Sequence, residues 1–285
     1  MTKEATIDYL KNIRGNDQPL FFILGPCVIE SEAHVLKMAE ALKKLSQKLN
    51  FKFIFKSSFD KANRTSLQNF RGVGLKEGRR ILSKVRDDFD VPVVTDIHES
   101  WQAEEVASFS DVLQIPALLC RQTDLLIAAG KTGKIVHLKK GQFVAPMAMK
   151  KAAEKIEEGG NGKSGPIWLC ERGFAFGYGD LVVDFRNFPI MKSFQKPVVY
   201  DATHSIQRPS SLGGTSGGDR RFVADLAKSA VASGIAGVFM EVHDEPEKAL
   251  CDGPNSIRLS QIEGLLDYLI DLDKWVKSKE MPEIF

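Results

Sequence analysis

The stretch LFFILGPCVIESEAHVLKMAEALKKLSQKLNFKFIF (residues 20–55) contains an apolar run, a long amphipathic segment and a second apolar run. The short runs LFFIL (20–24) and FKFIF (51–55) predict buried strands. Residues 32–49 between them repeat apolar side chains at three- and four-residue spacing, which predicts a helix. A strand, a helix and a second strand of this kind form the repeating unit of parallel α/β folds.

The same alternation continues along the chain without a linker. We predict eight strands, the other six at VPVVT (91–95), VLQI (112–115), KIVHL (134–138), IWLC (167–170), PVVY (197–200) and GVFME (237–241). Another helix is predicted within DRRFVADLAKSAVASG (219–234), ending on a glycine cap. Eight such units predict one α/β domain over residues 1–285, a closed (β/α)8 TIM barrel with a short N-terminal extension.

An open doubly wound sheet is the alternative fold. It is disfavoured because GPCVIES (25–31) follows the first strand, where a dinucleotide-binding sheet carries G-x-G-x-x-G. The Gly- and Ser-rich segment RPSSLGGTSGGD (208–219) predicts a mobile loop after the seventh strand.

Composition excludes several classes of protein. The 285 residues include 39 Lys and Arg against 37 Asp and Glu, so the net charge of +2 is too balanced for nucleic-acid or membrane-surface binding. The N-terminal segment is polar, and no apolar run approaches the roughly 20 residues that span a bilayer. We therefore expect a cytoplasmic protein. Four cysteines far apart favour reduced thiols over a disulfide framework: Cys27, Cys120, Cys170 and Cys251.

The segment FKSSFDKANRTS (55–66) follows the second predicted strand and is rich in cations. Lys56, Lys61 and Arg64 suit phosphate and carboxylate groups, because Arg offers a planar fork of donors and Lys a point charge. A solvated basic loop is the alternative. Asn63 and the interleaved hydroxyl residues favour a ligand site, since they would orient a polar ligand.

In a (β/α)8 barrel the active site lies at the carboxyl ends of the strands. A basic arc is expected there, formed by Lys56, Lys61, Arg121, Lys139 and Arg172. These cations would repel one another unless a polyanion lay among them, so we expect a small substrate with phosphate and carboxylate groups. Asp96 in this arc either neutralises a lysine or contacts a sugar hydroxyl.

A second set of residues follows strands one, seven and eight, which become neighbours only when the barrel closes. It combines a thiol, an imidazole and two carboxylates, from Cys27, His204, Glu241 and Asp252. This mixture suits a divalent transition metal and admits zinc, iron or manganese. Taken singly, each residue has a structural explanation, whereas all four on adjacent strand ends favour a metal site. We interpret the remaining histidines as structural, supporting, surface or core residues, namely His34, His98, His137 and His243.

Ten motifs occur in order over nearly the whole chain: GPCVIES, FKSSFDKANRTS, FRGVGLKEG, TDIHES, LQIPALLCRQTDLL, KKGQF, CERG, FGYGDLVVDFR, YDATHS and EVHDEPEKALCDGP. Through them the chain resembles the 3-deoxy-D-manno-octulosonate 8-phosphate synthases, also called 2-dehydro-3-deoxyphosphooctonate aldolases. That family joins phosphoenolpyruvate to D-arabinose 5-phosphate for lipopolysaccharide synthesis.

The heptulosonate phosphate synthases, which use erythrose 4-phosphate, share several of these motifs and are the closest alternative. They typically read KPRTSP where this chain has KANRTS, so Asn63 before Arg64 favours the octulosonate enzyme.

The resemblance implies a role for each site residue. Phosphoenolpyruvate would bind Gln114, Arg121, Lys139, Arg172 and Lys61, and the pentose phosphate would bind Lys56, Ser58, Asn63, Arg64, Thr65, Asp96 and Gln207. The catalytic residues would be Lys61, Lys139, His204 and Asp252. Cys27 marks the metal-dependent branch, with Cys27, His204, Glu241 and Asp252 as ligands. The family also implies a homotetramer in which Arg64 can serve a neighbouring subunit.

Two other classes of function remain as alternatives. A sugar-phosphate sensor would be expected to lose ligand or cation positions, and none is missing here. A metal-dependent hydrolase would not require two separate anion sites.

Overall fold

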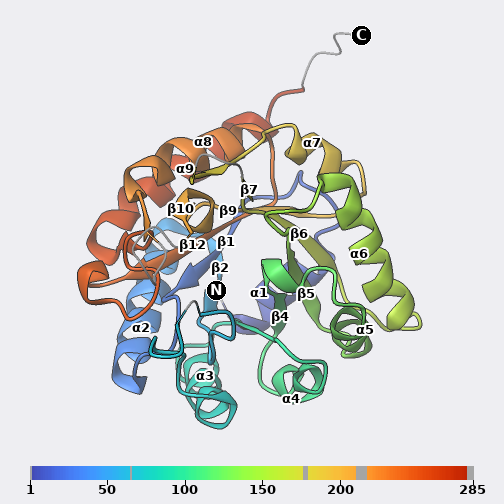
Figure 1. Ribbon diagram of the computed structural model, residues 1–285. Coiled ribbons are helices and arrows are strands. Elements are labelled where there is room, and N and C mark those ends of the chain that lie inside the picture. The colour runs from blue at the N-terminus through green and yellow to red at the C-terminus, as the bar shows by residue number, and fades with distance from the viewer. Residues whose placement is uncertain (1, 65, 176–178, 210–216, 281–285) are drawn as a thin grey trace.

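The computed structural model describes residues 2–64, 66–175, 179–209 and 217–280. Within these ranges eight parallel strands close into a barrel (Figure 1). They are β1 (Phe21–Gly25), β2 (Lys52–Lys56), β3 (Val93–Asp96), β4 (Val112–Ile115), β5 (Ile135–Lys139), β6 (Ile167–Glu171), β9 (Val198–Asp201) and β12 (Gly237–His243). All eight lie on the predicted apolar runs, so the predicted barrel is confirmed.

The barrel closes through β1, which pairs with β2 on one side and with β12 on the other. The open doubly wound sheet is therefore wrong. In this register Gly25 lies opposite Glu241. A Cβ at Gly25 would lie 2.0 Å from the carbonyl oxygen of Lys56, so β1 and β2 can approach this closely only with glycine here.

Helices form the outer ring of the barrel (Figure 1). They are α2 (Glu32–Leu49), α3 (Leu75–Asp88), α4 (Gln102–Ala107), α5 (Thr123–Lys131), α6 (Pro146–Gly159), α7 (Asn187–Lys192), α8 (Val223–Ala232) and α9 (Ile262–Lys277). Helix α2 has the predicted bounds. Helix α8 is shorter than its pattern because residues 220–222 form a 3-10 turn, and Gly234 follows it with the positive φ of +68° that a glycine cap requires.

The N-terminal extension contains α1 (Lys3–Asn12) and closes the amino-terminal end of the barrel. Leu10 and Ile13 pack into the barrel interior with Phe21, Trp168 and Phe239. Because α1 fills that end, a ligand can enter only at the carboxyl ends of the strands.

Short strands lie at the carboxyl end of the barrel. β7 (Phe174–Ala175) pairs with β8 (Leu181–Val182), β10 (Gln207–Arg208) pairs with β11 (Gly217–Gly218), and β13 (Ile257–Arg258) pairs in parallel with β12. The predicted loop 208–219 is thus flanked by β10 and β11, and its residues 210–216 lie outside the described ranges. No helix in the described ranges has the length and apolarity to cross a membrane.

Candidate active site

A cavity opens at the carboxyl ends of the barrel strands. Among the residues that line it are most of the predicted site residues, namely Lys56, Lys61, Asn63, Arg64, Asp96, Gln114, Lys139, Arg172, His204, Gln207 and Asp252. Cys27 and Glu241 are buried next to it. The barrel therefore brings together side chains from the carboxyl ends of all eight strands and from the loops that follow them.

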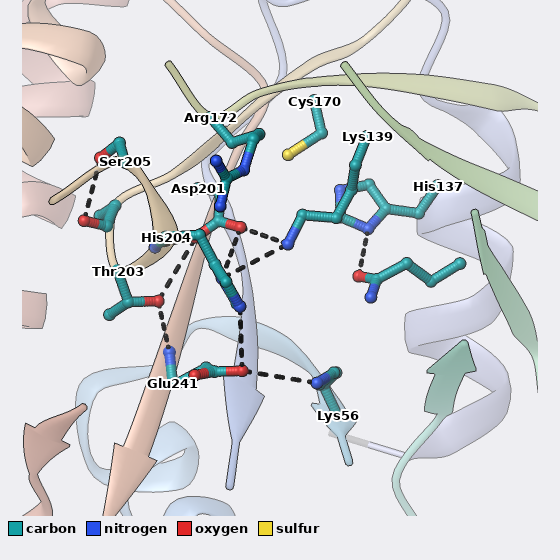
Figure 2. A network of polar contacts seen from close by, with 12 residues as sticks. Lys56, His137, Lys139, Cys170, Arg172, Asp201, Thr203, His204, Ser205 and Glu241 are labelled. Atoms are coloured by element: carbon teal, nitrogen blue, oxygen red, sulfur yellow. Dashed lines mark hydrogen bonds and ion pairs between the residues drawn. The ribbon is translucent and has the colours of Figure 1, made fainter. Parts of the chain in front are cut away.

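The four predicted metal ligands form a continuous chain of contacts. The Sγ of Cys27 lies 3.4 Å from Oδ2 of Asp252. That oxygen lies 3.7 Å from Nε2 of His204, which in turn lies 3.4 Å from Oε1 of Glu241. Figure 2 shows His204 and Glu241 directed toward each other. Neighbouring ligands of a tetrahedral metal lie roughly 3.4 Å apart or slightly more. His204, Glu241 and Asp252 form one group whose ligand atoms all lie within 4.8 Å of one another, whereas Cys27 belongs with Cys251 to a second group that shares Asp252.

The protonation of this cluster also fits a metal. Both carboxylate oxygens of Glu241 are buried without a hydrogen bond from a described residue. Lys56 compensates the charge at 3.6 Å from Oε1, and the lone pairs that receive no hydrogen bond remain available to a metal. Burial alone would raise the pKa of Asp252, but the charges of His204 and Lys61 lower it below its usual value. Burial raises the pKa of the Cys27 thiol, which a bound metal would reverse.

His204 is oriented by Asp201, the last residue of β9. Nδ1 of His204 lies 2.8 Å from Oδ2 of Asp201, which leaves Nε2 directed at Glu241 and Asp252. The same carboxylate forms an ion pair with Lys139 (Figure 2). Burial alone would raise the pKa of Asp201, but the charges of His204 and Lys139 lower it far below its usual value. A carboxylate behind the imidazole is the common support of a metal-binding histidine.

The basic side of the cavity carries a guanidinium that lacks a full set of acceptors. Nη2 of Arg172 donates to Oε1 of Gln207 at 2.7 Å, whereas Nη1 is buried without an acceptor in the described residues. Arg172 and Lys139 are 3% and 4% exposed. Two buried cations facing one cavity, one of them with an unused donor, are arranged to bind an anion.

A hydrogen-bond network fixes the opposite wall. Lys56 donates to the carbonyl oxygen of Cys27 and to Ser58, each at 2.9 Å. Ser58 donates to Asp96, which also accepts from Gln114, again at 2.9 Å. Gln114 is held from behind by His137 at 3.0 Å, a histidine whose pKa burial lowers to about 3. Every member of this wall thus has its orientation set before a ligand arrives.

Asp96 combines the two roles that its sequence context left open. It lies 4.0 Å from Nζ of Lys56 and also lines the cavity. Burial alone would raise its pKa, but the charges of Lys56 and Lys61 hold it well below the usual range. The carboxylate is therefore ionised and able to accept a hydrogen bond from a ligand hydroxyl.

Two predicted binding residues do not line the cavity, and a third lies outside the described residues. Arg121 is exposed and lies beside Phe143 and Lys155, away from the other cations. It follows the 3-10 turn after β4 and does not line the cavity of this chain, so its role as a phosphoenolpyruvate ligand stays a prediction. Ser58 is fully buried and uses its hydroxyl on Lys56 and Asp96 rather than on the cavity. Thr65 lies outside the described residues.

Arg64 lies on the cavity of its own subunit. Its Nη1 lies 2.9 Å from Sγ of Cys251 and its Nη2 donates to the carbonyl oxygen of Leu250 at 3.2 Å. The loop after β12 thus links a predicted sugar-phosphate ligand to the metal cluster.

Two residues of the site escaped sequence reasoning. Asp201 directly follows the predicted strand PVVY (197–200), three residues before His204, and this spacing could have suggested its support role. Cys251 precedes Asp252, and one ligand atom from each of Cys27, Cys251 and Asp252 lies within 4.8 Å of the others. Its thiol gave no signal because the loop that carries it has no regular periodicity.

The sequence is similar to a known protein family and to named relatives. A family model described as the DAHP synthetase I family matches residues 2–278. This chain belongs to that family. A 2-dehydro-3-deoxyphosphooctonate aldolase of Geotalea uraniireducens (strain Rf4) is 52% identical over 277 residues, 97% of this chain and 100% of the relative. A protein of the same name from Dichelobacter nodosus (strain VCS1703A) is 55% identical over 266 residues, 93% of this chain and 95% of the relative.

The support role of Asp201 can be tested in this family member by replacing it with asparagine. Asp201→Asn keeps the size of the side chain but loses the charge behind His204, so affinity of the cluster for a divalent metal is expected to fall roughly 10- to 100-fold. Equilibrium dialysis against cobalt(II) with elemental analysis measures this. Asp225→Asn, which removes an exposed pairing with Lys228, is the matched control, and equal affinities in the two variants would contradict the role.

Proposed function

We propose that the chain condenses phosphoenolpyruvate with D-arabinose 5-phosphate and water, giving 3-deoxy-D-manno-octulosonate 8-phosphate and inorganic phosphate. The observation that carries the proposal is one cavity in which buried cations, Lys139 and Arg172, lie beside the cluster of Cys27, His204 and Asp252. The names of the relatives support it.

Phosphoenolpyruvate is assigned to the inner, basic side of the cavity. Its phosphate and carboxylate would supply acceptors for Arg172 and Lys139, with Lys61 and Gln114 adjoining. The unpaired Nη1 of Arg172 provides the strongest support, because a buried guanidinium donor needs an acceptor.

The pentose phosphate is assigned to the outer side. Asn63 and Arg64 would receive its phosphate, and Asp96 and Gln207 its hydroxyls. Lys56 and Ser58 position Asp96 rather than bind the sugar themselves. In this proposal the sugar aldehyde would face carbon 3 of phosphoenolpyruvate.

In the proposed reaction, carbon 3 of phosphoenolpyruvate attacks the aldehyde carbon, and the aldehyde oxygen takes up a proton. Water adds at carbon 2. The tetrahedral intermediate then releases its carbon 2 phosphate by carbon–oxygen cleavage and yields the keto product. Lys61, Lys139 and Arg172 surround the anion that forms, and preorganised cations stabilise such an anion more than either substrate.

A divalent transition metal, zinc, iron or manganese, is proposed at Cys27, His204, Glu241 and Asp252. Bound there, it would supply a Lewis acid that orients the sugar or lowers the pKa of a water. The residues themselves fix the position of His204 through Asp201 and keep Asp252 ionised. We further propose that the enzyme is cytoplasmic and homotetrameric, as in the family it resembles.

The heptulosonate reaction with erythrose 4-phosphate is the second candidate, favoured by the description of the family model. A phosphate-release assay separates the two. Release is expected with phosphoenolpyruvate plus arabinose 5-phosphate and not with phosphoenolpyruvate alone. Preference for erythrose 4-phosphate would support the second candidate, release without a sugar a hydrolase, and no release at all a sensor.

Arg172, which directly follows β6, and Arg121, which lies in the segment after β4, test the assignment of the anion site. Arg172→Ala is expected to raise the Michaelis constant for phosphoenolpyruvate roughly 10- to 100-fold, because a charge-assisted hydrogen bond is worth about 1.5–3 kcal/mol. Arg121→Ala, which alters an exposed side chain outside the cavity, is expected to leave that constant unchanged. Steady-state kinetics at saturating sugar decide, and the reverse pattern would overturn the site.

Metal dependence is tested at Cys27. A chelator is expected to remove most activity and added manganese, iron, cobalt or zinc to restore it to different degrees. Cys27→Ala is expected to lose metal and activity together, whereas Cys27→Asn keeps an amide of similar size and some metal-free activity. Wild-type protein that is metal-free by elemental analysis yet fully active would refute the metal assignment and leave the anion site standing.

A further inference from the structure

A second cluster of ligand-type side chains lies on the outside of the barrel mouth. Glu30 follows β1, His34 lies in the first turn of α2, and His243 ends β12. One ligand atom from each lies within 4.8 Å of the other two. The His34 and His243 ring centroids are 4.4 Å apart, and Nε2 of His243 lies 3.4 Å from Oε1 of Glu30. That separation matches the roughly 3.4 Å between neighbouring ligands of tetrahedral zinc.

One nitrogen of each ring makes no hydrogen bond to a described residue, although Nε2 of His243 lies at ion-pair distance from Glu30. Nδ1 of His34 and Nε2 of His243 are buried and make no hydrogen bond to any described residue. His243 is only 5% exposed, so water does not readily satisfy its ring. An unpaired buried polar atom destabilises the fold, and two such ring nitrogens close to one carboxylate point to a bound cation.

The opposite nitrogen of each ring faces a single carboxylate oxygen. Oδ1 of Asp244 lies 3.0 Å from Nε2 of His34 and 3.1 Å from Nδ1 of His243. A carboxylate behind a metal-binding imidazole fixes the tautomer and leaves the other nitrogen free for the metal. In the structure the backbone N–H of Glu245 donates to Nδ1 of His243 at 3.0 Å. Metal binding at Nε2 would place the ring proton on Nδ1, and the N–H of Glu245 would then still have an acceptor, Oδ1 of Asp244 at 3.1 Å.

We propose that Glu30, His34 and His243 bind a second divalent transition metal, with zinc as the preferred ion and Asp244 as the support of both histidines. Two imidazoles and one carboxylate are the donors of open zinc sites, in which water completes the coordination. Glu30 also accepts the N–H of Leu250 at 2.8 Å. A metal here therefore stiffens the loop that carries Cys251 and Asp252, and it does so whatever reaction the cavity catalyses.

Cobalt(II) binding to the full-length chain tests the proposal, because cobalt replaces zinc and reports its ligands by absorption. Chelator-stripped wild type is expected to bind about two equivalents, one of which shows a thiolate-to-cobalt band from Cys27. His34→Gln is expected to bind about one equivalent with that band intact. Cys27→Ala is expected to lose the band and retain the sulfur-free equivalent.

Two further variants keep the test independent of folding defects. Glu30→Gln still accepts from Leu250 but loses its charge, and it is expected to lose the sulfur-free equivalent. Asp244→Asn is expected to weaken that equivalent roughly 10- to 100-fold. Glu40→Gln, which alters an exposed residue of α2, should bind like wild type. A single thiolate-ligated equivalent in wild type, or full sulfur-free binding by both His34→Gln and Glu30→Gln, would reduce the cluster to a hydrogen-bonded support.

Discussion

The pairing of β1 with β12 is the contact on which the site depends. It joins the first and last strands of the barrel and places Gly25 opposite Glu241, so the chain leaving β1 carries Cys27 to the residues that follow β12. Without closure, Cys27 and Asp252 would lie at opposite edges of a sheet. The same closure brings Glu30 to His243. Both ligand clusters are therefore consequences of one strand pairing between segments more than 200 residues apart.

Closure of the barrel also brings many charged side chains together at the cavity. The cavity is stable because its buried cations lie beside carboxylates. Lys56 is 1% exposed and lies between Asp96 and Glu241. Lys139 is paired with Asp201 in the same way. Buried ions are tolerated only when paired and hydrogen-bonded. The carboxylates beside Lys56 and Lys139 therefore allow the protein to stay folded without substrate. Arg172 still has a donor, Nη1, without an acceptor among the described residues, and this donor is available to an incoming anion.

Sequence pattern predicted what depends on periodicity and on position at a strand end. The eight strands and α2 follow from apolar spacing. Lys139 ends β5 and Arg172 directly follows β6, so both must face the barrel mouth. Arg121 comes six residues after β4, beyond a 3-10 turn, and a loop of that length no longer fixes direction. The resemblance implied that Ser58 binds the pentose phosphate, whereas its hydroxyl is hydrogen-bonded to Lys56 and Asp96. Sequence pattern alone does not show which partner a buried hydroxyl takes.

The segment from Glu241 to Asp252 links the two clusters mechanically. Asp252 has a φ of +49°, a conformation that is strained for most residues and that persists only where neighbours impose it. Here the carbonyl oxygen of Asp252 accepts from the N–H groups of Asn255 and Ser256, and its carboxylate contacts Cys27. Two residues earlier in the same loop, Glu30 accepts a hydrogen bond from the N–H of Leu250. Because Glu30 fixes the N–H of Leu250, the loop loses less conformational entropy when Asp252 binds a ligand. The cluster of Glu30, His34 and His243 therefore helps to order the loop that carries Cys251 and Asp252.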